Sequence, residues 1–165
     1  MSSTVLVLLF LWLSSALGLL VPQHYCDNHF RYASNDGNRT YIGVFTAPET
    51  RSRSLNINLN WQVTFEMQGR RNMFVSPLTT YPSSEEAAVN IKNGQPAQVW
   101  VHFINITNEL PKLTSLNLNG QELCHSAPYR LRKTRVTVKH HMYITKIRTP
   151  IVPTTEVYPQ LYSIE

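Results

Sequence analysis

Signs of a catalytic site are scarce in this sequence of 165 residues. Aspartate occurs only as Asp27 and Asp36, and both lie in turn-like contexts. No Gly-x-Ser-x-Gly segment or comparable frame could place a nucleophilic serine beside a histidine and an acid. The sequence therefore predicts a protein that is not an enzyme and uses no cofactor.

Clusters of metal ligands are also missing, although the chain has six histidines. His140 and His141 are adjacent in a stretch of extended type, and neighbours on a strand point to opposite faces. His24, His29 and His125 lie near cysteines, but their spacing is not that of zinc ligands. We therefore predict no metal site.

Long apolar runs are limited to the N-terminus. Residues 5–13 are apolar without interruption, and small residues follow at Ala16 and Gly18. This pattern is typical of a signal peptide, residues 1–18, cleaved after Gly18. A signal anchor is the alternative, but the largely apolar stretch has only about 17 residues, short of the roughly 20 that span a bilayer. We expect a secreted, extracellular protein with no stable membrane span.

Cysteine is equally rare, since Cys26 and Cys124 are the only two. In an oxidising compartment the simplest outcome is one disulfide between them, and two buried free thiols are the alternative. On the chain-entropy model, closing a loop of this length stabilises a fold by about 4–5 kcal/mol. Sequons at Asn38 and Asn105 fit a glycosylated surface.

Alternation of apolar and polar residues, in contrast, is abundant. Residues 55–67 alternate without a break, which predicts a long strand with one face on a core and the other in water. Shorter patterns predict strands at residues 30–33, 40–45 and 98–104. Asn119-Gly120 between apolar residues predicts a hairpin with a type I′ turn.

One short helix is expected within residues 82–94. Ser83 and Glu86 have capping-box spacing, and a glycine stands where the helix should end. About nine residues are too few for an isolated helix, so it must dock on a sheet. The expected contacts are Ala88, Val89 and Ile91. Together these elements predict a mainly β protein, an antiparallel β-sandwich of immunoglobulin-like architecture with one short helix.

Several short blocks between the two cysteines are recognisable together: Cys26…Phe30-Arg31-Tyr32, Asp36-Gly37, Tyr41-Ile42-Gly43, Glu85-Glu86-Ala87-Ala88-Val89, Val101-His102-Phe103, Leu110-Pro111-Lys112-Leu113 and Leu116…Asn119-Gly120…Leu123-Cys124. These blocks resemble the N-terminal domain of insect serine proteases of the gastrulation-defective type. The resemblance covers residues 26–124 and implies that these form the domain. It also implies that the two cysteines are the first and last landmarks of that domain.

In proteases with this domain, a trypsin-like catalytic domain follows it. The sequence has no Gly-Asp-Ser-Gly-Gly, no Ala-Ala-His-Cys and no Ile-Val-Gly-Gly, and only 41 residues follow Cys124. The resemblance therefore implies an accessory, non-catalytic module and not a protease.

Acidic residues are absent from residues 125–149. Residues 26–124 hold eight basic and eight acidic residues, whereas residues 125–149 hold seven basic residues. We predict an anion-binding strip whose candidate residues are Arg130, Arg132, Lys133, Arg135 and Lys139, with the strongest contact within residues 130–135. Its targets would be sulfated glycosaminoglycan, acidic partner surfaces or anionic lipid, and not nucleic acid. A solvated linker is the alternative, and the proline-containing residues 150–165 are expected to be disordered.

Three functional hypotheses follow. The first is a secreted regulatory module that binds extracellular proteins, among them serine proteases of a cascade. The second is a protein that binds glycosaminoglycan or another surface through its basic segment. The third is a truncated protease product with no independent role, which a continuing open reading frame in transcripts would reveal.

Overall fold

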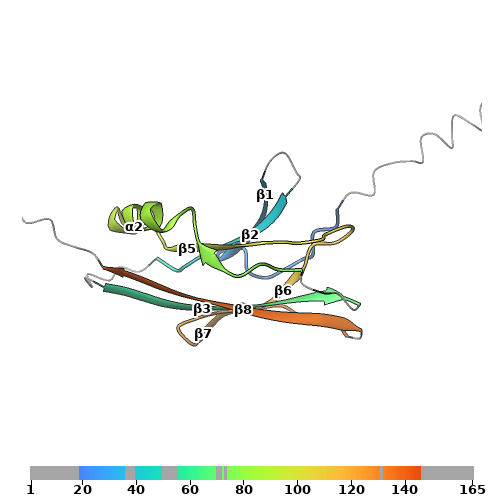
Figure 1. Cartoon of the computed structure of the whole chain (residues 1–165). Helices are drawn as coiled ribbons and strands as arrows, with labels where there is room; N and C mark the ends of the chain where they lie inside the picture. The colour runs from blue at the N-terminus through green and yellow to red at the C-terminus, as the bar shows by residue number, and fades with distance from the viewer. Residues whose placement is uncertain are drawn as a thin grey trace, which may run out of the picture.

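The computed structural model describes residues 19–35, 40–49, 56–69, 72, 74–130 and 132–145. They form two antiparallel sheets of four strands, packed as two layers with one helix beside them (Figure 1). One sheet has the order β1-β2-β5-β4, built from Phe30–Asn35, Thr40–Thr46, Gln98–His102 and Thr79–Thr80. The other has the order β7-β6-β3-β8, built from Gln121–His125, Lys112–Leu118, Asn56–Gln68 and Lys133–Thr145. The predicted antiparallel β-sandwich is confirmed.

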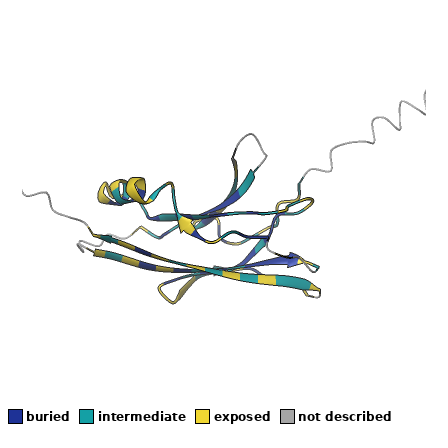
Figure 2. Cartoon of the chain, viewed as in Figure 1, coloured by how far each residue is buried: buried dark blue, intermediate teal, exposed yellow. Residues whose placement is uncertain are grey.

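The core lies between the two layers, where alternate residues of the strands meet (Figure 2). On β3, Leu59, Trp61, Val63, Phe65 and Met67 are buried and come from the apolar positions of the predicted alternation, and Glu66 is the one buried residue at a polar position. Aromatic rings from both sheets join there, and the Phe65 centroid lies 5.4 Å from that of Phe103. The alternation thus predicted the inner face of this strand correctly.

The hairpin predicted at Asn119-Gly120 is present. β1 pairs antiparallel with β2, and β6 pairs antiparallel with β7. Asn119 and Gly120 connect β6 to β7 with φ angles of 53° and 80°, the positive values that a type I′ turn requires. The side-chain amide oxygen of Asn119 also accepts a hydrogen bond of 2.7 Å from the backbone N–H of Asn60, which ties this turn to β3.

The helix, α2 (Ser84–Lys92), begins as its capping box predicts. The hydroxyl of Ser83 accepts a hydrogen bond of 3.2 Å from the backbone N–H of Glu86. Its buried residues are Ala87 and Ile91, whereas Val89 is 56% exposed. The prediction that Val89 docks is therefore wrong, because residues four apart share a helix face and a residue midway between them points away.

Cys26 and Cys124 form the predicted disulfide, with Cα atoms 5.6 Å apart. The bridge joins the segment before β1 to β7, and so links the two sheets. The same N-terminal segment is held at Leu20, which forms a parallel bridge with Glu109. These contacts anchor the described chain upstream of the first strand.

The folded part of the chain extends past Cys124, where the domain was expected to end, because β8 (Lys133–Thr145) belongs to the second sheet. β8 pairs antiparallel with β3 over 13 residues, from Gln68↔Lys133 to Asn56↔Thr145. The stretch predicted to be extended is extended, but it is also a full strand of the second sheet. Cys124 consequently does not lie in the last strand, because β8 follows it.

Candidate binding face

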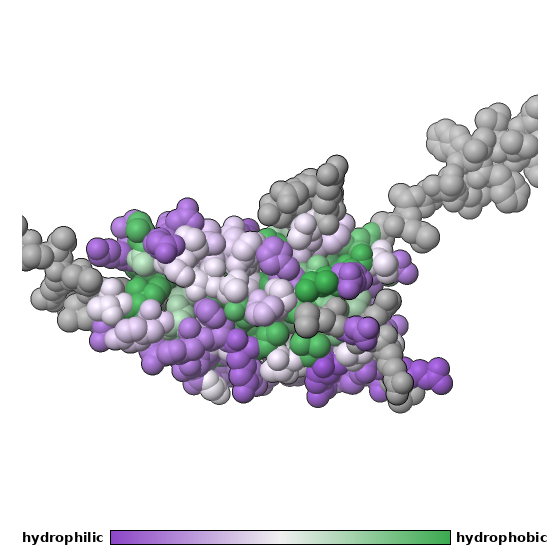
Figure 3. Space-filling model, viewed as in Figure 1, coloured by the Kyte–Doolittle hydropathy of each residue, from purple (hydrophilic) through white to green (hydrophobic). Residues whose placement is uncertain are grey.

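The outer face of the second sheet carries a group of polar side chains. β3 contributes Asn58, Asn60 and Gln62, which are the polar positions of its alternation. Gln62 stands opposite Lys139 of β8 on one side and Asn117 of β6 on the other. In the space-filling view, hydrophilic residues crowd the outer side of this layer (Figure 3).

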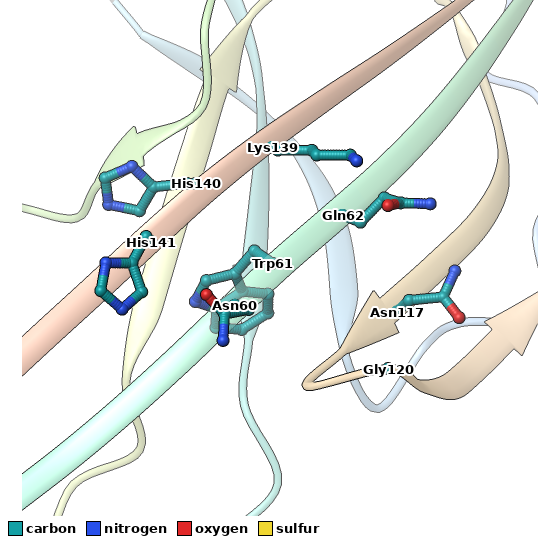
Figure 4. Close-up of a pocket in the computed structure, with 8 residues that line it drawn as sticks. All are labelled: Asn60, Trp61, Gln62, Asn117, Gly120, Lys139, His140 and His141. Atoms are coloured by element: carbon teal, nitrogen blue, oxygen red, sulfur yellow. The ribbon is translucent and has the colours of Figure 1, made fainter.

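Within this face is an open hollow of about 560 Å³. Its polar lining comprises Asn60, Gln62, Asn117, Lys139 and His141, and we call these five residues the amide face. Lys139, Gln62 and Asn117 extend to the same side of their strands (Figure 4). Side-chain amides can both donate and accept hydrogen bonds, and Lys139 adds one positive charge. The hollow is therefore better suited to a polar ligand than to an apolar one.

The hydrogen bonds around the hollow leave Lys139 available. His141 Nε2 lies 2.7 Å from Oδ1 of Asn58, and Asn117 Nδ2 donates to the hydroxyl of Ser115 at 2.8 Å. Within the described residues, Lys139 has no carboxylate partner. Its ammonium is therefore the unpaired charge of the amide face.

Two side chains on the inner side of the sheet also contribute to the hollow. Trp61 is buried, and its indole N–H has no hydrogen-bond partner in the described part of the chain. His140 Nε2 lies 3.0 Å from the Thr80 hydroxyl of β4, which joins the edges of the two sheets. Burial, and secondarily the neighbouring His141, lower the pKa of His140, so this ring is neutral at physiological pH.

A buried carboxylate lies on the same outer face, at the other end of the strands. The side chain of Glu66 has no exposed surface. Its Oε1 lies 2.9 Å from Lys133 Nζ and 2.6 Å from Arg135 Nη2, and Nε of Arg135 also donates to Oε1. The backbone N–H of Tyr129 donates to Oε2 at 2.8 Å.

These partners set the ionisation of Glu66. Burial raises the pKa of a carboxyl group by disfavouring its charged form. Hydrogen bonds from Lys133, Arg135 and the Tyr129 backbone outweigh that effect, and they hold the pKa of Glu66 below its ordinary value. Glu66 is thus a charged, fully paired group that fastens β8 and the preceding loop to β3.

Tyr129, whose backbone N–H bonds to Glu66, is also held through its side chain. Its hydroxyl donates a 2.5 Å hydrogen bond to Oε1 of Glu109, and the Lys112 ammonium lies 5.2 Å from its ring centroid. Burial and the bond to Glu109 raise the pKa of Tyr129. The loop before β8 is consequently docked on the sheet.

The structure separates the five residues of the predicted anion-binding strip. Lys133 and Arg135 are engaged with Glu66, and Arg130 and Arg132 are exposed before β8 begins. Lys139 lies six positions beyond Lys133 on the same strand, roughly 20 Å away. One compact site cannot contain all five, although binding of an anion by the exposed residues stays a prediction.

The two sequons differ in what the structure describes. Asn105 is exposed and has a φ of 55°, whereas Asn38 lies outside the described residues.

No group of three or more histidine, cysteine, aspartate or glutamate side chains within the described ranges could hold a metal ion. In the same residues, no helix has the length and apolar character needed to cross a membrane.

Sequence reasoning missed the amide face and the burial of Glu66. The sequence held a signal for both. The polar positions of β3 from Asn56 to Gln62 are all amides, and Glu66 is the one acidic residue of the whole strand. The alternation showed which side these residues occupy, but not that a loop covers one end of that side.

In a comparison with protein families, residues 24–134 match the model described as serine protease gd N-terminus. No curated protein and no solved structure matches the chain. The matched residues run from the segment before Cys26 into the start of β8. They include Glu66 and the loop that covers it, but end before Lys139. Domains of this kind are the non-catalytic N-terminal part of a protease, and the chain belongs to this family of serine protease gd N-terminal domains.

Proposed function

We propose that this protein is a secreted, non-catalytic binding module that acts with serine proteases of an extracellular cascade. Family membership supports an accessory role beside such proteases. The observation that carries the proposal is the amide face, which places the amides of Asn60, Gln62 and Asn117 together on paired strands of one sheet. Such a face offers donors and acceptors at fixed positions, which suits recognition of another protein.

The test is capture of partners from extracellular fluid by the full secreted chain, with cross-linking and identification by mass spectrometry. Serine proteases or their regulators should be enriched, and the double variant Gln62→Ala/Asn117→Ala should lose them. The matched control, Glu85→Ala/Gln95→Ala, changes two exposed polar residues near α2 and should retain them. If no protease or protease regulator is enriched above an unrelated β-sandwich, the proposal is wrong.

A separate assay addresses catalysis directly. The purified chain should not hydrolyse arginyl peptide substrates, and fluorophosphonate probes should not label it. Stoichiometric labelling of any serine would overturn the non-catalytic assignment.

A second candidate function is binding of sulfated glycosaminoglycan. The observation that favours it is Lys139, an ammonium without a carboxylate partner in the described chain, set among amides that could bind hydroxyl groups. Lys139→Glu should lower the salt concentration that elutes the chain from a heparin column, because such contacts are electrostatic and screened by salt. Lys92→Glu, the same charge change on α2, should have a smaller effect. Equal elution of the two variants would remove Lys139 from any such site.

A further inference from the structure

β8 has an open edge of unusual length. It pairs with β3 along all 13 of its residues, and no described strand pairs with its other side. In an antiparallel sheet, alternate residues of an edge strand direct their N–H and C=O groups away from the sheet. Such an edge is a template for another strand, and natural proteins usually keep exposed edges short or covered.

The other three edge strands of the sandwich are shorter. β4, on the same side of the sandwich, has only two residues, and the contact of Thr80 with His140 brings it against β8. β1 and β7, at the opposite ends of the two sheets, have six and five residues. β8 is therefore the longest edge that the described part of the sandwich presents.

A groove runs beside this edge. A hollow of about 550 Å³ is lined by Val75 and Pro77 of the first layer and by Val136 and Val138 of β8. The two β8 valines are only half-buried, although they belong to the inner face of the strand. Hydrophobic side chains gather between the two layers on the face seen in the space-filling view (Figure 3). A strand added to β8 would place every second side chain over this groove.

The charge of β8 indicates which strand fits. The strand contains no acidic residue, and its solvent-facing positions include Arg135, Lys139 and His141. Arg135 is already matched by Glu66, so Lys139 is the cation left for a partner. On a strand added to the open edge of β8, an acidic side chain opposite Lys139 would pair with this unmatched charge.

A second copy of β8 fits less well. In an antiparallel pair of two β8 strands centred on Lys139, that lysine would face its own copy, and like charges directly opposite are destabilising. Lysine on an edge strand is a common means of preventing self-pairing. The partner is therefore a different segment.

We propose that β8 binds an extended peptide of a partner protein by strand addition. In this peptide apolar residues alternate with acidic ones. The apolar side chains cover Val136 and Val138 in the groove, and an acidic side chain lies beside Lys139. The inference rests on the proposed function, since it names the class of segment that a partner would present.

The test uses a short synthetic peptide of alternating valine and glutamate, flanked by threonines, and the full secreted chain. Binding should raise the hydrogen-exchange protection of alternate β8 amides about tenfold, because strand addition bonds every second residue. A peptide of the same composition in scrambled order should bind more weakly. Equal binding of the scrambled peptide, or no alternating protection on β8, would overturn the inference.

Charge exchange supplies the second arm. Lys139→Glu should weaken the valine–glutamate peptide by about five- to tenfold and strengthen a valine–lysine peptide. Val138→Ser should weaken both peptides, while Val89→Ser, at an exposed valine of α2, should weaken neither. A sedimentation measurement that finds a dimer through β8 would contradict the assigned occupant.

Failure of this inference can be told apart from failure of the proposed function. If proteases are captured but Lys139→Glu and Val138→Ser leave capture unchanged, the edge inference is wrong and the binding module stands. If the peptide binds with alternating protection but no protease or regulator is captured, the edge site stands and the proposed function is wrong.

Discussion

Glu66 and Arg135 face each other across β3 and β8, and the guanidinium of Arg135 lies 2.6 Å from a carboxylate with no exposed surface. A charge buried in this way is tolerated only when it is fully paired. The pairing also gives β8 a contact specific to one register, because a shift by one residue would turn Arg135 away from Glu66.

Replacing Glu66 with glutamine should destabilise the protein strongly. The change leaves Lys133 and Arg135 without their counter-charge, and breaking a buried pair costs about 3–5 kcal/mol. Because Lys133 and Arg135 are partly exposed and can be rehydrated, we expect the lower end, about 3 kcal/mol. Urea unfolding should show this loss, whereas Glu122→Gln, at an exposed glutamate of β7, should stay within about 0.5 kcal/mol of the parent.

Stability should decrease in acid, in part through Glu66. Its folded-state pKa lies below the ordinary value of 4.5, so its contribution is fully present above pH 4.5 and is lost as the pH falls through the folded-state pKa. The difference in unfolding free energy between parent and Glu66→Gln should therefore be large at pH 7 and smaller at pH 3. A difference that does not change with pH would show that the charge of Glu66 contributes nothing.

Gly43 should not tolerate alanine. A Cβ at this position would lie 2.8 Å from Cε2 of Phe30 and 3.0 Å from Cζ of Phe103. Both rings are buried in the aromatic cluster, so they cannot move without repacking, and overfilling a core costs about 1–3 kcal/mol. Thermal unfolding of Gly43→Ala should show the loss. The double variant Gly43→Ala/Phe103→Leu should recover part of it if the clash is the cause.

The disulfide should contribute to stability through the long loop that it closes. Peptide mapping of secreted protein without reduction should recover Cys26 joined to Cys124. The double variant Cys26→Ser/Cys124→Ser should lose up to about 4–5 kcal/mol of unfolding free energy. Freely alkylated thiols in the native secreted protein would contradict both the bridge and the expected oxidising compartment.

Elements encoded in neighbouring residues could be predicted well. The alternation from Leu55 to Met67 predicted β3 and its buried face, and Asn119-Gly120 predicted the turn between β6 and β7. Ser83 and Glu86 likewise predicted the start of α2. Each of these signals depends on backbone geometry or solvent exposure within a few neighbouring residues, so a local stretch of sequence is enough to predict the element.

Contacts between residues far apart in the sequence were decided only by the tertiary structure. The basic residues after Cys124 form one strip in the sequence, but pairing of β8 with β3 brings Lys133 and Arg135 to Glu66 and leaves Lys139 in the amide face. The partner and register of β8 depend on contacts between segments about 70 residues apart, here Glu66 and Arg135, and no local pattern specifies them. By itself the sequence therefore determined β1, β2, β3 and β5, the turn between β6 and β7, the start of α2 and the total charge, but not β4 or the pairing of β8. Only the packing of the two sheets decided which charges are buried, which remain available and which edge stays open.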